Sequence, residues 1–214
     1  ELTDLVLIEL MAKQNKPILI STGMGSIEEI EEAVATVQNT GNNQILLFHC
    51  ISGYPIPTNE SNLSNIRFLA KKFGVEVGLS DHSTNNIAAT VSIGLGAVAI
   101  EKHFKIDDQD SGPDSSFSLV PDQVKSLVND CTDAWLALGS QEFGRSKIED
   151  SNKAFRRSLY FVKDLSKGMI LTKSDLRRIR PGYGLKPKFF NELIGKTLVK
   201  DVERGDPVKL DCFD

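Results

Sequence analysis

Four short apolar runs rich in β-branched residues, separated by segments with helical periodicity, limit most strongly what this chain can fold into. The runs are 17–22, 44–49, 75–80 and 97–101; helical patterns cover 5–11, 26–39, 60–73, 84–94 and 121–138. A capping-box sequence at Ser26–Glu29 marks the start of one helix. Short, nearly continuous apolar runs are typical of parallel strands covered on both faces. Strict alternation therefore predicts an α/β fold with a parallel sheet and right-handed crossovers, either doubly wound or part of a (β/α)8 barrel.

Polar residues gather where the predicted strands end, and this favours the barrel. The clusters are Ser21-Thr22-Gly23, His49-Cys50, Ser80-Asp81-His82 and Glu101-Lys102-His103. Barrel enzymes place their chemistry at that rim, where side chains from several strands converge. Four strands are half of the eight that a barrel needs, and the chain enters a helical pattern directly from Glu1. We therefore expect the second half of a TIM barrel, cut from a larger protein.

Composition excludes several classes of protein. Of the 214 residues, 40% are hydrophobic and 25% charged, the balance of a globular protein, and the net charge of -4 gives no general attraction to nucleic acid. No apolar run approaches the ~20 residues of a membrane helix. The three cysteines are widely spaced, which argues against a disulfide framework or a cysteine zinc site. We expect a cytoplasmic protein that binds neither nucleic acid nor membranes.

The composition changes after about residue 140, which predicts two domains. Residues 1–139 form the half barrel, 140–154 a polar linker, and 155–214 a small, mostly β domain rich in Lys, Arg and Gly. Its strand-like pieces are 158–162 and 197–199. The segment Arg177–Gly184 is a basic loop punctuated by Gly and Pro. A solvated turn is the ordinary interpretation, and the alternative is that Arg180 reaches into an active site to hold a carbonyl or an anion.

All three histidines, His49, His82 and His103, fall at or just past predicted strand ends. Any one of them alone has about even odds of being a structural residue. Together they are more informative, because neighbouring parallel strands bring their ends within reach of one ion, and His82 and His103 follow consecutive strands. Neutral imidazole with open water positions suits a divalent ion such as Mn²⁺, Zn²⁺ or Fe²⁺.

Carboxylates accompany these histidines. Glu101 lies two residues before His103, so both point to the same side of an extended strand. Beside a metal site it can orient a ligand, hold a hydroxyl or shuttle a proton; the alternative is a salt bridge to Lys102 or to another residue of the rim. Asp81 is expected to position its loop. In the loop Ser111–Ser118, Gly and Pro set the turn and leave Asp114 and the serines free to face a ligand.

Six motifs occur in order along the chain: His49–Pro55, Gly78–Ser83, Glu101–Phe104 and Gly112–Asp114, followed by Arg156–Leu159 and Arg180–Gly184. In combination they resemble the sialic acid synthase family, which comprises N-acetylneuraminate, pseudaminate and legionaminate synthases and spore-coat polysaccharide synthase relatives. The last two motifs resemble the family's antifreeze-like SAF domain. Family members carry a whole (β/α)8 barrel before that domain, and Glu1–Asp4 would match the stretch after its fourth strand.

The resemblance implies condensation of phosphoenolpyruvate with a 2-acetamido hexose, which releases phosphate and gives a nine-carbon 2-keto acid. It implies that His82 and His103 hold a divalent metal, Mn²⁺ or Mg²⁺, which polarises the sugar aldehyde. Glu101 and Asp114 would position water or hydroxyl groups, with an acid–base role open. The open alternatives are a metal-dependent barrel aldolase or hydrolase, and a carbohydrate-binding module without activity.

The resemblance also implies substrate-binding residues. Ser21 and Ser80 match contacts to phosphoenolpyruvate or phosphate, and Tyr54 would line the sugar site. Ser52 stands where the family often has Asn, which leaves the sugar open between N-acetylmannosamine and a 6-deoxy-diacetamido hexose. In the family the SAF domain caps the partner's barrel, so Arg180 would contact the N-acetyl group in a domain-swapped homodimer.

Overall fold

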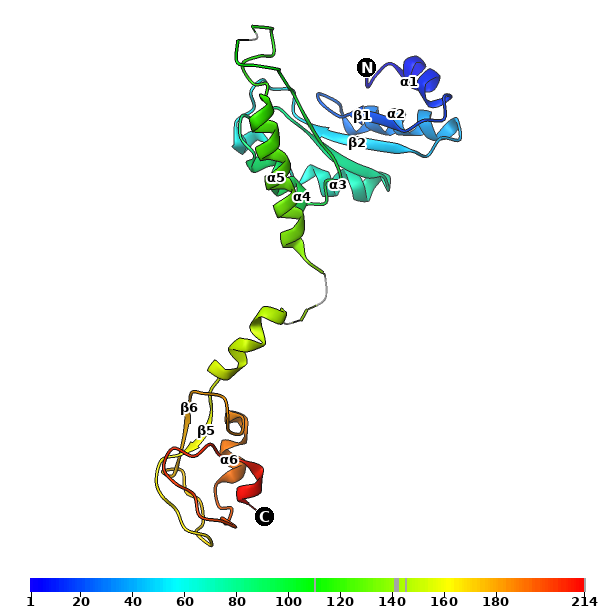
Figure 1. The fold of residues 1–214 in the computed structure, drawn as a ribbon. Coiled ribbons are helices and arrows are strands. Elements are labelled where there is room, and N and C mark those ends of the chain that lie inside the picture. Colours follow the sequence, from blue (N-terminus) through cyan, green and yellow to red (C-terminus); the bar gives the residue numbers. More distant parts are fainter. Residues whose placement is uncertain (110, 141–142, 145, 214) are drawn as a thin grey trace. The chain divides into compact units, whose positions relative to one another are not determined.

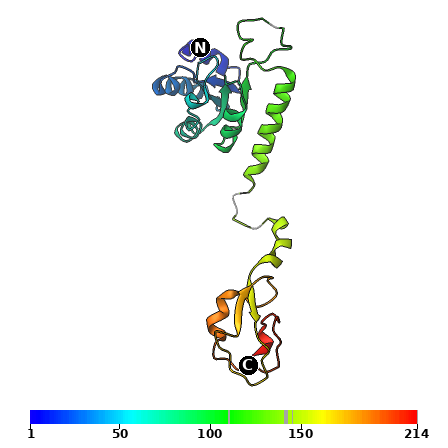
Figure 2. The ribbon, with the colours of Figure 1, turned by 90° about the vertical axis from the view of Figure 1, so that its left-hand side faces the viewer.

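The structure is a computed structural model that describes residues 1–109, 111–140, 143–144 and 146–213. The chain divides into two compact units, which we call the first unit (Glu1–Ser140) and the second unit (Gln141–Asp214) (Figure 1). The helices of the first unit are α1 (Leu5–Ala12), α2 (Ile27–Asn39), α3 (Asn65–Phe73), α4 (Ile87–Gly94) and α5 (Pro121–Leu138). Its strands are β1 (Ile18–Ser21), β2 (Ile45–Cys50), β3 (Glu76–Asp81) and β4 (Ile100–Lys102). Figure 2 shows α5 as the long green helix that ends this unit.

The four strands form one parallel sheet in the order β1-β2-β3-β4. Strands that follow one another in the chain are therefore neighbours in the sheet. A doubly wound sheet reverses its strand order at a switch point, and this sheet does not. The sheet curls as half of a barrel does, so the predicted fold class, the second half of a TIM barrel, is confirmed.

The outer face of the sheet carries the apolar core of the first unit. Side chains on β1 alternate sharply: Ile18 and Ile20 are 5% and 6% exposed, whereas Leu19 between them is 54% exposed. The core includes outward strand residues (Ile18, Ile20, Ile45, Leu47, Val77, Leu79) packed against helix residues (Ile8, Ala12, Ile30, Ala33, Val34, Val37, Ile66, Leu69, Ala88). Full burial of each large aliphatic side chain stabilises the fold by about 1.5–3 kcal/mol. The opposite, inner face of the sheet points away from this core.

The predicted helices are present, with two starts displaced for local reasons. Ser26 and Glu29 form the expected capping box: the Ser26 amide donates to the Glu29 carboxylate at 2.7 Å, and the Glu29 amide donates to Ser26 Oγ at 3.3 Å. The helix expected at 60–73 begins only at Asn65, because Asn62 has a φ of 42°, which a helix cannot continue through. The helix expected at 84–94 begins at Ile87, whose amide donates to the Asn85 side chain at 2.9 Å.

The second unit is small, with little regular structure. β5 (Ser158–Phe161) pairs antiparallel with β6 (Leu176–Ile179), and α6 (Phe190–Leu193) is a single turn. Its core is formed by Leu159, Phe161, Leu171, Leu176, Leu198 and Val208. Two 3-10 helices, Lys147–Glu149 and Ser151–Phe155, occupy much of the predicted linker 140–154, of which residues 141, 142 and 145 lie outside the described residues.

Two expectations for the second unit were wrong in detail. The piece 197–199 is no strand: Thr197 and Leu198 make only isolated bridges, to Ile170 and Phe213. The basic segment Arg177–Gly184 is a loop only in part, since β6 runs to Ile179. Leu176 is buried and anchors that strand, while the three residues after it are exposed. Because two of those residues are basic, the sequence pattern did not indicate a strand there.

We predict that Asp175→Asn destabilises the second unit in a pH-dependent way. Burial raises the pKa of the Asp175 carboxyl, but hydrogen bonds from Lys163 Nζ (2.7 Å), the Thr172 amide (2.8 Å) and Thr172 Oγ1 outweigh it and lower the pKa to about 2. Because the folded pKa lies below the ordinary 3.8, the stabilisation is complete above 3.8 and disappears as the pH falls toward 2. The substitution should cost about 1–2 kcal/mol at neutral pH and almost nothing at pH ~2.

Urea unfolding of the whole chain, followed through the β5 amide signals at both pH values, measures this. Asp211→Asn is the matched control, because Asp211 pairs with Lys200 at 2.8 Å on the surface and should matter much less. An equal loss for both variants at neutral pH would contradict the prediction.

Candidate active site

The inner face of the sheet collects polar side chains at the C-terminal strand ends. Ser80 on β3 is in register with Cys50 on β2 and with Glu101 on β4. Residues in register on parallel strands point to the same face, so these side chains form one row. Ser21, at the end of β1, points to the same face, because it pairs with Phe48, two residues before Cys50.

This row opens on a cavity of about 550 Å³ at the rim of the sheet. Its lining includes predicted site residues from all four strand ends: Ser21, Ser52, Tyr54, Ser80, His82, Glu101 and His103. Leu7, Ile8 and Met11 of α1 contribute an apolar wall. The structure thus brings together the residues of the first unit that the sequence indicated, with Asp114 beside His103.

His82 and His103 both line the cavity, and their rings are in edge contact. Their ring centroids are 5.2 Å apart with an interplanar angle of 64°. Tyr54 lies over the pair, 4.3 Å from the His82 ring and 5.9 Å from the His103 ring. The two imidazoles are therefore close enough to act on one bound atom.

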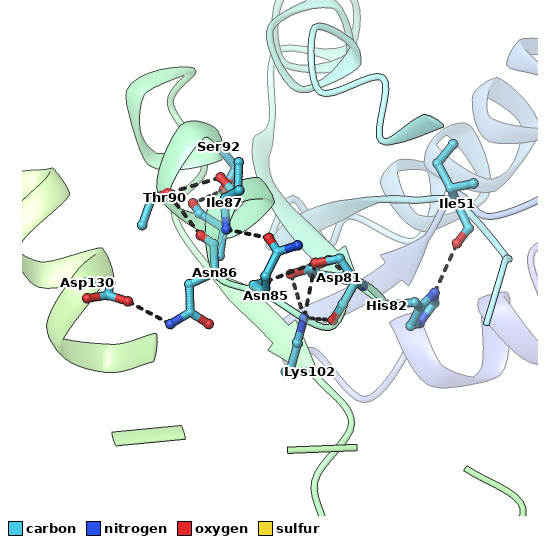
Figure 3. Close-up of polar contacts among 12 residues, drawn as sticks. Ile51, Asp81, His82, Asn85, Asn86, Ile87, Thr90, Ser92, Lys102 and Asp130 are labelled. Atoms are coloured by element: carbon cyan, nitrogen blue, oxygen red, sulfur yellow. Dashed lines mark hydrogen bonds and ion pairs between the residues drawn. The ribbon is translucent and has the colours of Figure 1, made fainter. Parts of the chain in front are cut away.

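Each imidazole is held from behind at Nδ1. His82 Nδ1 lies 3.0 Å from the Ile51 carbonyl oxygen, as Figure 3 shows, and His103 Nδ1 lies 3.4 Å from Asp114 Oδ2. A carbonyl oxygen only accepts a hydrogen bond, so in the contact with Ile51 the His82 ring donates from Nδ1. Such a backing acceptor is the usual support of a histidine that ligates a metal.

The donor set fits a divalent cation. In the described part of the chain, no group of three or more His, Cys, Asp or Glu side chains is arranged to hold a metal. Two neighbouring imidazoles nevertheless suit an ion whose remaining positions are filled by oxygen atoms of water or substrate. His82 and His103 are the residues that could hold it.

Glu101 is tied to Ser80 and not to Lys102. Ser80 Oγ donates to Glu101 Oε1 at 2.7 Å, and both side chains line the cavity. Lys102 points to the opposite face, where its Nζ lies 2.7 Å from Asp81 Oδ2. The alternative of a Glu101–Lys102 salt bridge is therefore wrong, because neighbours on a strand point to opposite faces.

Asp114 reaches the site from the loop after β4. Its side chain is 60% exposed and contacts His103, so it can also face a ligand. Phe117, from the same loop, packs its ring 4.9 Å from His103 and 5.2 Å from Tyr54. The sequence analysis missed Phe117, because an apolar loop residue carries no chemical signal of its own.

His49 belongs to the other face. It is 2% exposed, and its Nε2 lies 2.9 Å from the Ser61 carbonyl oxygen. Burial lowers the pKa of its imidazole, an effect larger than the opposing one of that hydrogen bond. The structural interpretation holds for this histidine, whose strand position is one residue out of phase with the cavity row.

Arg180 lies in the second unit, where it follows β6 directly and is exposed. The Arg157 guanidinium, on the neighbouring β5 side, donates to the Arg178 carbonyl at 3.0 Å. The Arg180 side chain is thus available to a ligand, and its part in a site stays a prediction.

A curled parallel sheet with imidazoles, carboxylates and hydroxyls at one rim is the arrangement of (β/α)8 enzymes. Residues 1–143 match the NeuB family and residues 156–214 match the SAF domain. The chain belongs to the NeuB family, which confirms the resemblance read from its motifs.

Its relatives include named sugar acid synthases. The chain is 39% identical to the pseudaminic acid synthase of Campylobacter jejuni over all of its own length and 62% of the relative's, and 36% identical to the N,N'-diacetyllegionaminic acid synthase of Legionella pneumophila over 96% and 59%. Among solved structures, it is similar to the spore coat polysaccharide biosynthesis protein of Bacillus subtilis (33% identity, TM-score 0.63, all of this chain and 65% of that one). The chain thus spans less than two thirds of these relatives.

Two further observations bear on earlier expectations. Cys50, Cys131 and Cys212 are all free thiols in the structure. Among the helices of the described residues, none is both long and apolar enough to cross a lipid bilayer.

We predict that His49 stays neutral at a pH where an ordinary imidazole is half protonated. Its lowered pKa means that the neutral ring stabilises the fold above about 6.5, and that this stabilisation fades as the pH falls further. Histidine-selective NMR titration measures the pKa directly, with the signal assigned through His49→Gln. A His49 pKa at or above 6.5 would show the prediction wrong.

Proposed function

We propose that the protein carrying this chain condenses phosphoenolpyruvate with a 2-acetamido hexose to form a nine-carbon 2-keto sugar acid, with release of phosphate. The observation that carries the proposal is the facing pair His82 and His103 above a cavity shared with Glu101 and Ser80. The names of relatives that match nearly all of this chain support the same class of reaction.

The reaction joins two carbon skeletons and breaks one carbon–oxygen bond. C3 of phosphoenolpyruvate attacks the aldehyde carbon of the open-chain sugar, the C=C electron pair forms the new bond, and the aldehyde oxygen takes up a proton. Water adds at C2, and the bond from C2 to the phosphate oxygen then breaks, which leaves a keto group at C2. The protein must hold phosphoenolpyruvate, a sugar and a water together, and so needs several separate groups of donors and acceptors.

His82 and His103 are proposed to hold a divalent cation, Mn²⁺ or Mg²⁺, through Nε2. Bound there, the cation would supply Lewis acidity toward the aldehyde oxygen of the sugar. The Ile51 carbonyl and the Asp114 carboxylate, at 3.0 Å and 3.4 Å from the two Nδ1 atoms, are proposed to orient the two rings for this role.

The remaining residues are assigned by their place in the cavity. Glu101, oriented by Ser80, is proposed to position the water or a sugar hydroxyl and to exchange a proton with it. Ser21 and Ser80 offer hydroxyl donors to phosphoenolpyruvate or phosphate. Ser52 and Tyr54 face the same cavity and are proposed to line the sugar subsite.

Three further assignments concern the assembly, the location and the acceptor sugar. A homodimer is proposed, in which a second copy of the chain supplies Arg180 to the N-acetyl carbonyl of the sugar. A cytoplasmic location is proposed because the three cysteines are free, as reducing compartments keep them. The acceptor is either N-acetylmannosamine or a 6-deoxy-diacetamido hexose.

The proposal predicts that the full gene product releases phosphate from phosphoenolpyruvate only when an amino sugar and a divalent metal are present. A phosphate assay over a panel of the candidate sugars, with and without EDTA, measures the requirement, and mass spectrometry identifies the nine-carbon acid. Phosphate release that ignores the sugar would refute the synthase, and turnover of a sugar without phosphoenolpyruvate would indicate an aldolase or hydrolase instead.

A second prediction concerns the metal. His82→Ala and His103→Ala should each weaken Mn²⁺ binding by about tenfold or more, because each removes one of two imidazole ligands. Water-proton relaxation during a Mn²⁺ titration measures the affinity. The matched control is His49→Gln, which changes a histidine on the other face and should leave the affinity unchanged. Equal affinities in all variants would place the metal elsewhere.

A further inference from the structure

A buried ion pair lies directly behind the two facing histidines. Asp81 and Lys102 are in register on β3 and β4, with side chains 2% and 6% exposed and a distance of 2.7 Å between Lys102 Nζ and Asp81 Oδ2. They occupy the face of the sheet opposite the cavity, and neither lines it. Each is nevertheless the direct chain neighbour of one facing histidine, since Asp81 precedes His82 and Lys102 precedes His103.

Hydrogen bonds extend this pair around His82. Asp81 Oδ1 accepts from the Ser83 amide at 2.8 Å, and Lys102 Nζ also donates to the Ser83 carbonyl. Figure 3 shows the Lys102 ammonium at the centre of these contacts. Asp81 and Ser83 flank His82 in the chain, and both contact Lys102, the residue that precedes His103.

Stability alone does not explain this arrangement. Removing two charges from water costs several kcal/mol per ion, and well-packed apolar residues are often as stable in the same place. A buried ion pair instead specifies the register of the two strands, because its charges are paired in only one alignment. A slip of one residue would move β4 by about 3.3 Å and turn Glu101 and His103 away from the cavity.

β4 has particular need of such a tie. It is three residues long and pairs with β3 over those three residues, Leu79–Ile100 to Asp81–Lys102. Just beyond it, the described chain shows only an isolated bridge, between Phe104 and Leu119. The last rung of the β3–β4 ladder is the one that holds the ion pair, immediately before the two histidines.

We propose that Asp81 and Lys102 are positioning residues of the active site, which hold the imidazoles of His82 and His103 at the separation and orientation that a shared cation needs. The purpose of this role depends on the proposed function, whereas the geometry that supports it does not. The pair acts through the backbone of both strand ends, without contact to substrate.

The test compares Lys102→Met, Asp81→Asn and the double variant Asp81→Asn/Lys102→Met with the unmodified protein. Single variants leave one buried charge without its partner and are expected to lose stability; the double variant removes both charges and should fold. In every folded variant the ring signals of His82 and His103 should shift in histidine-selective NMR, while that of His49 stays in place. Mn²⁺ affinity should fall by about tenfold or more.

Lys163→Met is the matched control, since it breaks a second 2.7 Å lysine–aspartate pair, with Asp175, in the other unit. It should leave both the ring signals and the Mn²⁺ affinity unchanged. A folded double variant with unchanged His82 and His103 signals would overturn the positioning role, whatever its catalytic activity. If the ring signals shift but the unmodified protein never releases phosphate, the positioning role stands and the proposed synthase fails.

Discussion

The parallel register between β3 and β4 is the constraint on which the site depends. Because side chains on a strand alternate with a period of two, one alignment decides which residues meet the cavity and which meet the core. With Ser80 opposite Glu101, the two histidines that follow the strands face the same space, and Asp81 meets Lys102 behind them. One face of the β3–β4 pair thus carries residues that line the cavity, and the other face carries the buried ion pair.

The same alternation explains a glycine in the floor of the site. A Cβ on Gly78 would lie 2.6 Å from the Phe48 ring and 2.8 Å from the Ala99 carbonyl oxygen, so no other residue fits there without displacement. Gly78 is in register with Phe48, and its missing side chain leaves room for that ring beneath the cavity. An apolar floor lowers the local dielectric and strengthens polar contacts at the rim.

Three histidines with similar sequence positions have different environments. His49 is enclosed, and burial lowers its pKa, which suits a neutral structural residue. His82 and His103 keep one edge toward the cavity and are backed by acceptors at Nδ1. The two cavity-lining histidines differ from His49 in the face of the strand that the ring occupies and in the acceptor that lies beside Nδ1.

The sequence by itself determined the alternation of strands and helices, the capping box at Ser26 and the cluster of polar strand ends, because these follow from local periodicity and short-range hydrogen bonds. Only the tertiary structure decided that β6 runs through a basic segment, and that Phe117 and Tyr54 pack around the histidines. It also decided the partner of Lys102, which is Asp81 on the neighbouring strand and not the adjacent Glu101. Such choices depend on strand register and on packing between distant segments, which composition and spacing do not encode.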